Sequence, residues 1–266
     1  MALRSMSFVI HADTKVGKST LANTAPAPRL LIDAEAAYRY LPGKKIFWDP
    51  LQEPMPILGQ GRTDPQVGTP VYSWDWETCV VIVHTYSHMK QAAELLRYYA
   101  HPFVSVNIDS ISEIQTRLKD QITNFTGQMD RDKWGQLLND MTLLVRGLRD
   151  LTEHPNTPLQ SLCLTAMTDL RGGKWRPFLE GALKTRMPYW LDVLGYMYVA
   201  DLPNPDPTQM PQTMRVLAVE PGPTYEAGNR IQETEFSHKL PALIGNPTIP
   251  DMITAVFGPE RQLSAA

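Results

Sequence analysis

The chain has 266 residues, 43% hydrophobic and 20% charged, a balance typical of a globular protein with one sizeable core. Its 25 Lys and Arg against 28 Asp and Glu give a net charge of −3, which disfavours a uniformly basic nucleic-acid coat protein but permits a local basic groove. The only two cysteines, Cys79 and Cys163, each lie in an apolar run, so we expect buried thiols, no disulfide framework and a reducing cytoplasm.

Short apolar runs alternate with helical patterns along the chain. In order, the sequence predicts a strand at 7–12, a loop at 13–19, a helix at 18–24, strands at 29–32 and 79–83, a helix at 87–99, a strand at 102–109, helices at 112–125 and 134–152, a strand at 162–167, a basic loop at 170–188, paired strands at 193–200 and 214–219, and a short C-terminal helix. This alternation favours an α/β fold with a mostly parallel central sheet flanked by helices, and a C-terminal antiparallel strand pair.

We expect one domain over residues 1–266, interrupted at about 38–75 by a loop-rich insertion that is rich in proline and glycine. Three tryptophans in or beside this segment, Trp48, Trp74 and Trp76, are expected to fasten it to the core. The N-terminus has no signal-peptide pattern, and its apolar run SFVI is too short to span a membrane.

The most specific motif follows the first strand, where Gly17-Lys18-Ser19 completes a Walker A pattern with Ala12 in place of the first glycine. Gly17 lets the backbone approach phosphates, and the loop N–H groups with the helix N-terminus form an anion cradle. Lys18 would neutralise the β- and γ-phosphates of ATP, and Ser19 would ligate Mg²⁺. The predicted nucleotide-binding residues are Asp13, Thr14, Lys15, Val16, Gly17, Lys18, Ser19 and Thr20.

Two acidic segments are candidates for the metal and the attacking water. The run VSVNID ends in Asp109, which we expect to hold Mg²⁺ through water; the alternative is that Asp109 caps the next helix. The run LLID leads to Glu35, the candidate general base, since strand ends in open α/β sheets line the ligand crevice. Asp33 competes for this role.

These segments together resemble the RecA family of recombinases, in which a Walker A loop precedes a strand ending in Asp-Ala-Glu and another ending in Asp-Ser, as at residues 33–35 and 109–110 here. The resemblance implies a RecA-like P-loop core and Glu35 as catalytic base. The sequence is more closely similar to phage-encoded RecA-like AAA-family proteins, including Sak-type single-strand annealing proteins, through the segments 109–112, 132–135, 192–196 and 225–230. One departure is that Thr168-Asp169 occupies the place where RecA proteins have a Gln that senses the γ-phosphate. The coupling between ATP and DNA binding can therefore differ from that of RecA proteins or be lost.

The resemblance also implies contacts with DNA and with neighbouring subunits. RecA cores bind single strands through two loops, which here fall at 124–133 and 170–187. The predicted DNA contacts are Arg171, Lys174, Trp175 and Arg176, because basic residues around an aromatic suit backbone tracking and base stacking. Arg230 resembles the cation that a protomer inserts into its neighbour's ATP site, a catalytic role; a plain surface arginine is the alternative.

The sequence therefore predicts a cytoplasmic, Mg²⁺-dependent ATPase that forms a homo-oligomeric ring or filament and binds single-stranded DNA in phage-type recombination or annealing. A single-strand-binding protein is a further candidate partner, and no membrane is expected. Two alternatives stay open: a small P-loop kinase with the basic loop as its lid, and a binding module that uses ATP only as a structural ligand.

Overall fold

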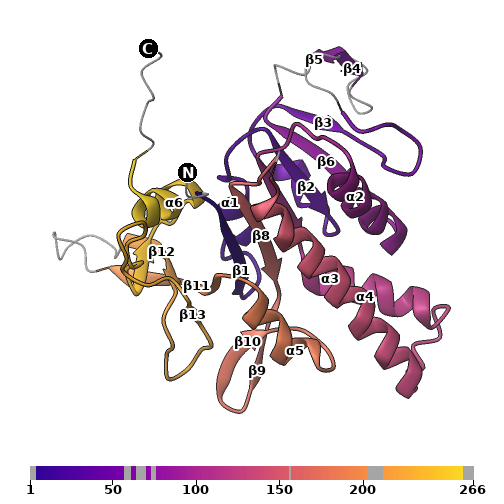
Figure 1. Ribbon diagram of the computed structural model, residues 1–266. Coiled ribbons are helices and arrows are strands. Elements are labelled where there is room, and N and C mark those ends of the chain that lie inside the picture. The colour runs from indigo at the N-terminus through magenta and orange to yellow at the C-terminus, as the bar shows by residue number, and fades with distance from the viewer. Residues whose placement is uncertain are drawn as a thin grey trace.

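The computed structural model of the protein describes residues 4–56, 61–63, 70–72, 76–155, 157–202 and 212–259. A large sheet crosses the middle of the molecule with helices on both faces (Figure 1). In chain order its strands are β1 (Met6–Ala12), β2 (Arg29–Asp33), β3 (Lys45–Phe47), β6 (Thr78–Ile82), β7 (Ser105–Asp109), β8 (Ser161–Ala166), β11 (Val193–Leu202), β12 (Gln212–Ala218), β13 (Gly228–Asn229) and β14 (Leu243–Gly245).

The strands lie side by side in the order β14-β12-β11-β1-β8-β7-β2-β6-β3, with β13 paired to the start of β11. All neighbours from β11 to β3 are parallel, whereas β12, β13 and β14 pair antiparallel. The predicted α/β fold, a RecA-like core with a mostly parallel sheet and a C-terminal antiparallel pair, is therefore confirmed.

The two faces of the central sheet carry different sets of helices. One face carries α2 (Tyr86–Tyr98), α3 (Ile111–Ile122) and α4 (Arg131–Arg149), and the other carries α1 (Lys18–Ala22) and α6 (Ile249–Phe257) (Figure 1). The remaining helical turns are η1 (Ala37–Tyr40), η3 (Asp150–Glu153), α5 (Leu183–Arg186) and η4 (Met187–Trp190).

Strand β1 lies inside the sheet and is buried along its whole length. Successive side chains of a strand point to opposite faces, so Phe8 and Ile10 pack with α1 and α6, and Val9 packs in the core under α2, α3 and α4. Because β1, β2, β7 and β8 are parallel, their carboxyl ends meet at one edge of the sheet, and the register places Asp33 beside Asp109 there. The predicted site residues follow these strand ends.

The segment at 38–75 is more regular than expected. Its β3 joins the edge of the main sheet, and β4 (Gly61–Thr63) pairs with β5 (Pro70–Tyr72) as a hairpin. Trp48 and Trp76 are 2% and 5% exposed, with ring centres 6.4 and 6.0 Å from that of Phe103, so both fasten this region to the core. Residues 57–60, 64–69 and 73–75, which include Trp74, lie outside the described residues.

The prediction of an irregular loop at 170–188 is wrong. Strands β9 (Thr168–Arg171) and β10 (Lys174–Pro177) form an antiparallel hairpin, followed by α5 and η4. The turn between the strands is Gly172-Gly173, with φ of 58° and 75°. Two residues with positive φ are what a tight hairpin turn needs, so the glycines belong to a β-turn and not to a free loop.

Candidate functional site

The Walker A segment joins β1 to α1 as a tight loop. Gly17 precedes the first helical residue with φ 115°, a left-handed conformation that glycine adopts without a steric penalty. Lys18 folds back across the loop, and its Nζ donates to the carbonyl oxygens of Ala12 and Asp13, both at 3.0 Å. Ala12 is the last residue of β1, where extended backbone suits any residue, so its replacement of glycine is compatible with this loop.

Asp109 ends β7 next to this loop. One of its carboxylate oxygens accepts a hydrogen bond from the hydroxyl of Thr165 on β8, and the other, Oδ2, is buried with no hydrogen-bond partner among the described residues. The cap of α3 is Ser110, whose Oγ accepts from the N–H of Glu113 at 3.3 Å, so capping does not explain Asp109.

A buried, unpaired carboxylate oxygen is costly unless a cation completes it. Ser19 lies in the first turn of α1, and no described residue forms a hydrogen bond with its hydroxyl. A carboxylate and a hydroxyl are oxygen ligands of the kind that Mg²⁺ prefers, so Asp109 and Ser19 fit the predicted ion.

Asp33 and Glu35 differ clearly in their contacts. Asp33 is 1% exposed, and its two oxygens accept from the backbone N–H groups of Glu35 at 2.8 Å and Tyr38 at 2.7 Å. These bonds fix the turn after β2, which leaves Asp33 a structural role. Glu35 is exposed, and its carboxylate accepts from the hydroxyl of Ser110.

The electrostatics of the site link these groups. Although Glu35 as a whole residue is exposed, neighbouring groups partly desolvate its carboxyl and raise its pKa. The hydrogen bond from Ser110 and the charge of Lys18 oppose this change, whereas the charge of Asp109 reinforces it. Burial lowers the pKa of Lys18, while Glu35, Asp109 and Asp13 oppose that change. Lys18, Glu35 and Asp109 therefore influence one another's charge and lie together at the carboxyl edge of the sheet.

His11, which no sequence motif indicates, lies on β1 beside the phosphate loop. It is completely buried, with Nε2 2.7 Å from the carbonyl oxygen of Glu226 and Nδ1 3.0 Å from Oγ1 of Thr168. Since a carbonyl only accepts, Nε2 carries the hydrogen of the neutral ring, which leaves Nδ1 as an acceptor. The single hydroxyl hydrogen of Thr168 is shared between Nδ1 of His11 and the carbonyl oxygen of Arg176, which lies 2.9 Å away. Burial lowers the pKa of His11 to about 4, and the positive charge of Lys18 adds to that effect.

A stack of three tyrosines begins next to His11, with Tyr196 and Tyr198 on β11 and Tyr225 in the segment after β12. The rings of Tyr196 and Tyr225 stack 5.0 Å apart, and Tyr198 extends the stack at 5.8 Å from Tyr196. His11 lies 5.2 Å from the ring of Tyr196. Residues that meet here come from distant parts of the chain, so no local sequence pattern indicates this cluster.

The predicted DNA-contact residues lie on the β9–β10 hairpin, and much of their polar capacity is already used. Arg171 pairs with Asp169 at 2.9 Å, Lys174 donates to the carbonyl oxygen of Gly222 at 3.0 Å, and Arg176 lies 3.4 Å from Glu226. Trp175 is half-buried, and its backbone is joined to residues 224 and 226.

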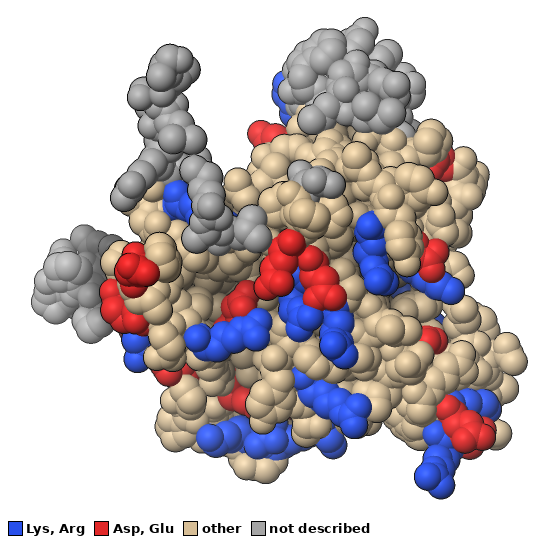
Figure 2. Space-filling view, viewed as in Figure 1, with Lys and Arg blue, Asp and Glu red and all other residues tan. Residues whose placement is uncertain are grey.

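The hairpin also forms one wall of a hollow. Lys and Arg side chains gather at the lower edge of the molecule, where β9, β10 and α5 lie (Figure 2). The hollow measures about 620 Å³, and its charged lining residues are Arg171, Arg176, Lys184, Asp192, Glu226 and Arg230. Four cations against two carboxylates leave it with a positive balance.

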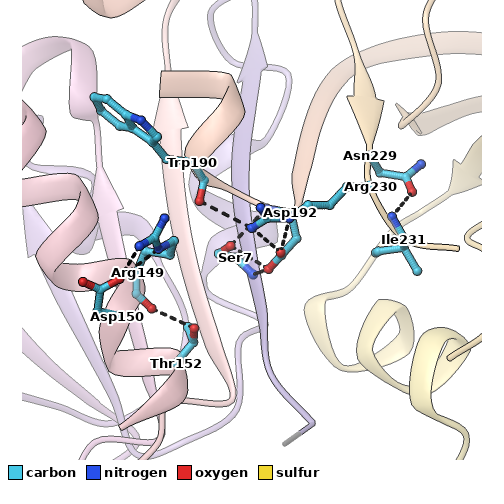
Figure 3. Close-up of polar contacts among 9 residues, drawn as sticks. All are labelled: Ser7, Arg149, Asp150, Thr152, Trp190, Asp192, Asn229, Arg230 and Ile231. Atoms are coloured by element: carbon cyan, nitrogen blue, oxygen red, sulfur yellow. Dashed lines mark hydrogen bonds and ion pairs between the residues drawn. The ribbon is translucent and has the colours of Figure 1, made fainter. Parts of the chain in front are cut away.

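Arg230 lies far from the phosphate loop of its own chain. Its Nε and Nη2 both lie 2.7 Å from Oδ1 of Asp192 (Figure 3). Asp192 in turn accepts from the N–H and hydroxyl of Ser7, near the start of β1, whereas the phosphate loop follows the end of that strand. Arg230 therefore cannot complete the ATP site of its own chain.

Two features are absent from the described part of the chain. No group of three or more His, Cys, Asp or Glu is arranged to hold a metal ion. None of the described helices has the length and apolarity needed to cross a membrane. Cys79 and Cys163 are both buried thiols, as predicted.

A parallel sheet, a Walker A loop after its first strand, and a carboxylate at the end of a nearby strand define the class of P-loop ATPases with a RecA-like core. Within that class the chain belongs to the AAA domain family, whose model matches residues 4–231. No curated protein matches the sequence.

Two solved structures are similar to the chain at low sequence identity. One is a prototypical ATPase from the type III secretion system of pathogenic bacteria, with a TM-score of 0.45, 15% identity, and coverage of 73% of this chain and 52% of that one. The other is the flagellar accessory protein FlaH from Methanocaldococcus jannaschii, with a TM-score of 0.35, 11% identity, and coverage of 83% and 78%. The chain spans about half the length of the first of these proteins.

Proposed function

We propose that the protein binds ATP with Mg²⁺, hydrolyses it between neighbouring protomers and binds single-stranded DNA. The observation that carries the nucleotide part is the grouping of Lys18, Asp109 and Glu35 at one edge of the sheet, with Asp109 Oδ2 buried and unpaired among the described residues. The loop from Asp13 to Thr20 supplies backbone N–H groups for the phosphates.

Each side chain has a distinct task in this proposal. The Lys18 ammonium, now held by two carbonyl oxygens, neutralises phosphate charge. Ser19 and Asp109 hold Mg²⁺, which supplies charge neutralisation at the phosphates when bound. Glu35 accepts a proton from the attacking water, and its raised pKa brings it nearer to the value that suits a general base at neutral pH. Arg230 acts in trans, after exchanging Asp192 for a neighbour's phosphate.

The basic hollow supports binding of single-stranded DNA. Its four cations exceed its carboxylates by two, and the half-buried Trp175 stands on the same hairpin, although outside the hollow's lining. Phosphate contacts of this kind give affinity without sequence preference. Because Arg171, Lys174 and Arg176 already have partners in the chain, we assign the first contact to Lys184, and the hairpin cations follow by exchanging partners. A kinase lid has to be mobile, so these same pairs within the chain argue against the alternative in which residues 170–187 form such a lid.

The decisive experiment is ATP hydrolysis with and without single-stranded DNA, with Lys18→Ala as the inactive control. We expect hydrolysis that DNA stimulates and that the variant loses. Hydrolysis indifferent to DNA would contradict the DNA part and favour a kinase. ATP binding without hydrolysis would favour a structural role of ATP, and an active Lys18→Ala variant would refute the assignment of the loop.

A further inference from the structure

Arg215 reaches the phosphate loop from β12, a strand that no sequence motif connects with this loop. Its backbone lies on β12 opposite Val199 and is fixed by Asn246, whose N–H donates to the Arg215 carbonyl at 2.7 Å. The side chain extends to the loop, where Nε donates to the carbonyl oxygen of Val16 at 2.9 Å.

The guanidinium lies against the face of Gly17 that lacks a side chain. A Cβ built on Gly17 would lie 2.7 Å from Nε, 3.1 Å from Cδ and 3.3 Å from Cζ of Arg215. The glycine of a P-loop is there so that phosphates can approach the backbone closely. Arg215 therefore lies at the rim of the space that the phosphate chain enters.

The arginines that line the basic hollow differ from Arg215 in their partners. Arg171, Arg176 and Arg230 each face a carboxylate at 2.9, 3.4 and 2.7 Å. Within the described part of the chain, the terminal nitrogens of Arg215 form no hydrogen bond or ion pair. A guanidinium without a counter-ion, held by Nε beside an anion-binding loop, keeps its Nη donors for an anion.

We propose that Arg215 binds the phosphate chain of the nucleotide in cis, at the Val16–Gly17 edge of the loop. This inference rests on the proposed ATP site and adds a positive charge to it that comes from the antiparallel edge of the sheet. Since the contact is at the loop glycine, it is made with ADP as well as with ATP. It also ties β12 to the phosphate loop when the nucleotide is bound.

The test compares nucleotide affinity in four proteins: wild type, Arg215→Ala, Arg215→Gln and Arg146→Ala. Arg146 is an exposed arginine on α4 with no described side-chain partner and serves as the matched control. Loss of a charge-assisted hydrogen bond predicts that both Arg215 variants bind ADP and ATP roughly tenfold or more weakly, while Arg146→Ala binds as wild type. Inorganic pyrophosphate, tested by competition, should lose affinity in parallel.

Arg215→Gln separates phosphate binding from simple bracing of the loop, because an amide can still donate to the Val16 carbonyl but carries no charge. A Gln variant with the wild-type unfolding temperature and weakened nucleotide binding supports the inference. If this variant binds ADP and ATP as tightly as wild type, Arg215 only braces the loop and the inference is overturned, although the ATP site stands. If wild type binds neither nucleotide, the proposed function fails as well.

Discussion

The buried His11 makes the stability of the protein depend on pH in a predictable direction. Burial lowers the pKa of His11 from 6.5 to about 4, so between these values the unfolded chain binds a proton that the folded protein does not. The free energy of unfolding therefore rises with pH across this window and falls as the solution is acidified through it. We expect His11→Gln to remove this part of the acid sensitivity.

The magnitude follows from the two pKa values. A difference from 6.5 to about 4 corresponds to ~3 kcal/mol when His11 is fully titrated in both states. At pH 5, where the unfolded imidazole is almost fully charged and the folded one almost neutral, about 2 kcal/mol is already lost relative to pH 7.5. This loss is a large fraction of the stability of an ordinary domain.

The assay is urea unfolding of the nucleotide-free protein at pH 7.5 and pH 5, for wild type and His11→Gln. Glutamine can donate to the Glu226 carbonyl and accept from Thr168, so it replaces both contacts without titrating. The buried His101, whose pKa is also lowered, is present in both proteins and cancels in the comparison. An equal loss of stability in the two proteins between these pH values would refute the reasoning.

Three further predictions concern the proposed ATPase. Glu35→Gln should keep ATP affinity within a few-fold but lower the hydrolysis rate by roughly 100-fold or more, measured by single-turnover phosphate release; a rate close to wild type would move the base elsewhere. Ser110→Ala should shift the acidic limb of the pH–rate profile to higher pH, because the lost hydrogen bond no longer favours the ionised Glu35 carboxylate; an unshifted limb would show that Glu35 is not the titrating group. Arg230→Ala mixed with Lys18→Ala should recover hydrolysis that neither variant has alone, since some shared sites are then intact; continued inactivity after proven subunit exchange would argue against a role in trans.

Much of the α/β core could be predicted from sequence because its strands are short, apolar and separated by helical patterns. The hydrophobic period identifies β1, β2, β7 and β8, and the Walker A spacing locates Lys18 at a strand end. The β9–β10 hairpin was missed although Gly172-Gly173 indicates a tight turn. Its strands, TDLR and KWRP, are too polar to show a buried face.

The rest depends on contacts between residues far apart in the chain. The hydrogen bond from Arg215 to Val16 joins positions 199 residues apart, and the one from His11 to Glu226 joins positions 215 apart. Such contacts follow from the order of strands in the sheet, which places β11 beside β1 and β12 beside β11. A single sequence indicates which segments form strands but not which strands lie side by side. Neither Arg215 nor His11 could therefore be assigned to the site in advance.

The positions of Arg215 and Arg230 suggest that the first serves the nucleotide of its own chain and the second that of a neighbour. Arg215 lies at the carboxyl end of β1 beside the phosphate loop, without a carboxylate partner among the described residues, and is therefore ready for an anion in the same chain. Arg230 is held by Asp192 near the amino end of the same strand, at 2.7 Å. Releasing it breaks a surface ion pair, which contributes only about 1 kcal/mol or less. In the proposed assembly, a neighbour's phosphate would therefore replace Asp192 at small cost, and we expect assembly and nucleotide binding to favour one another.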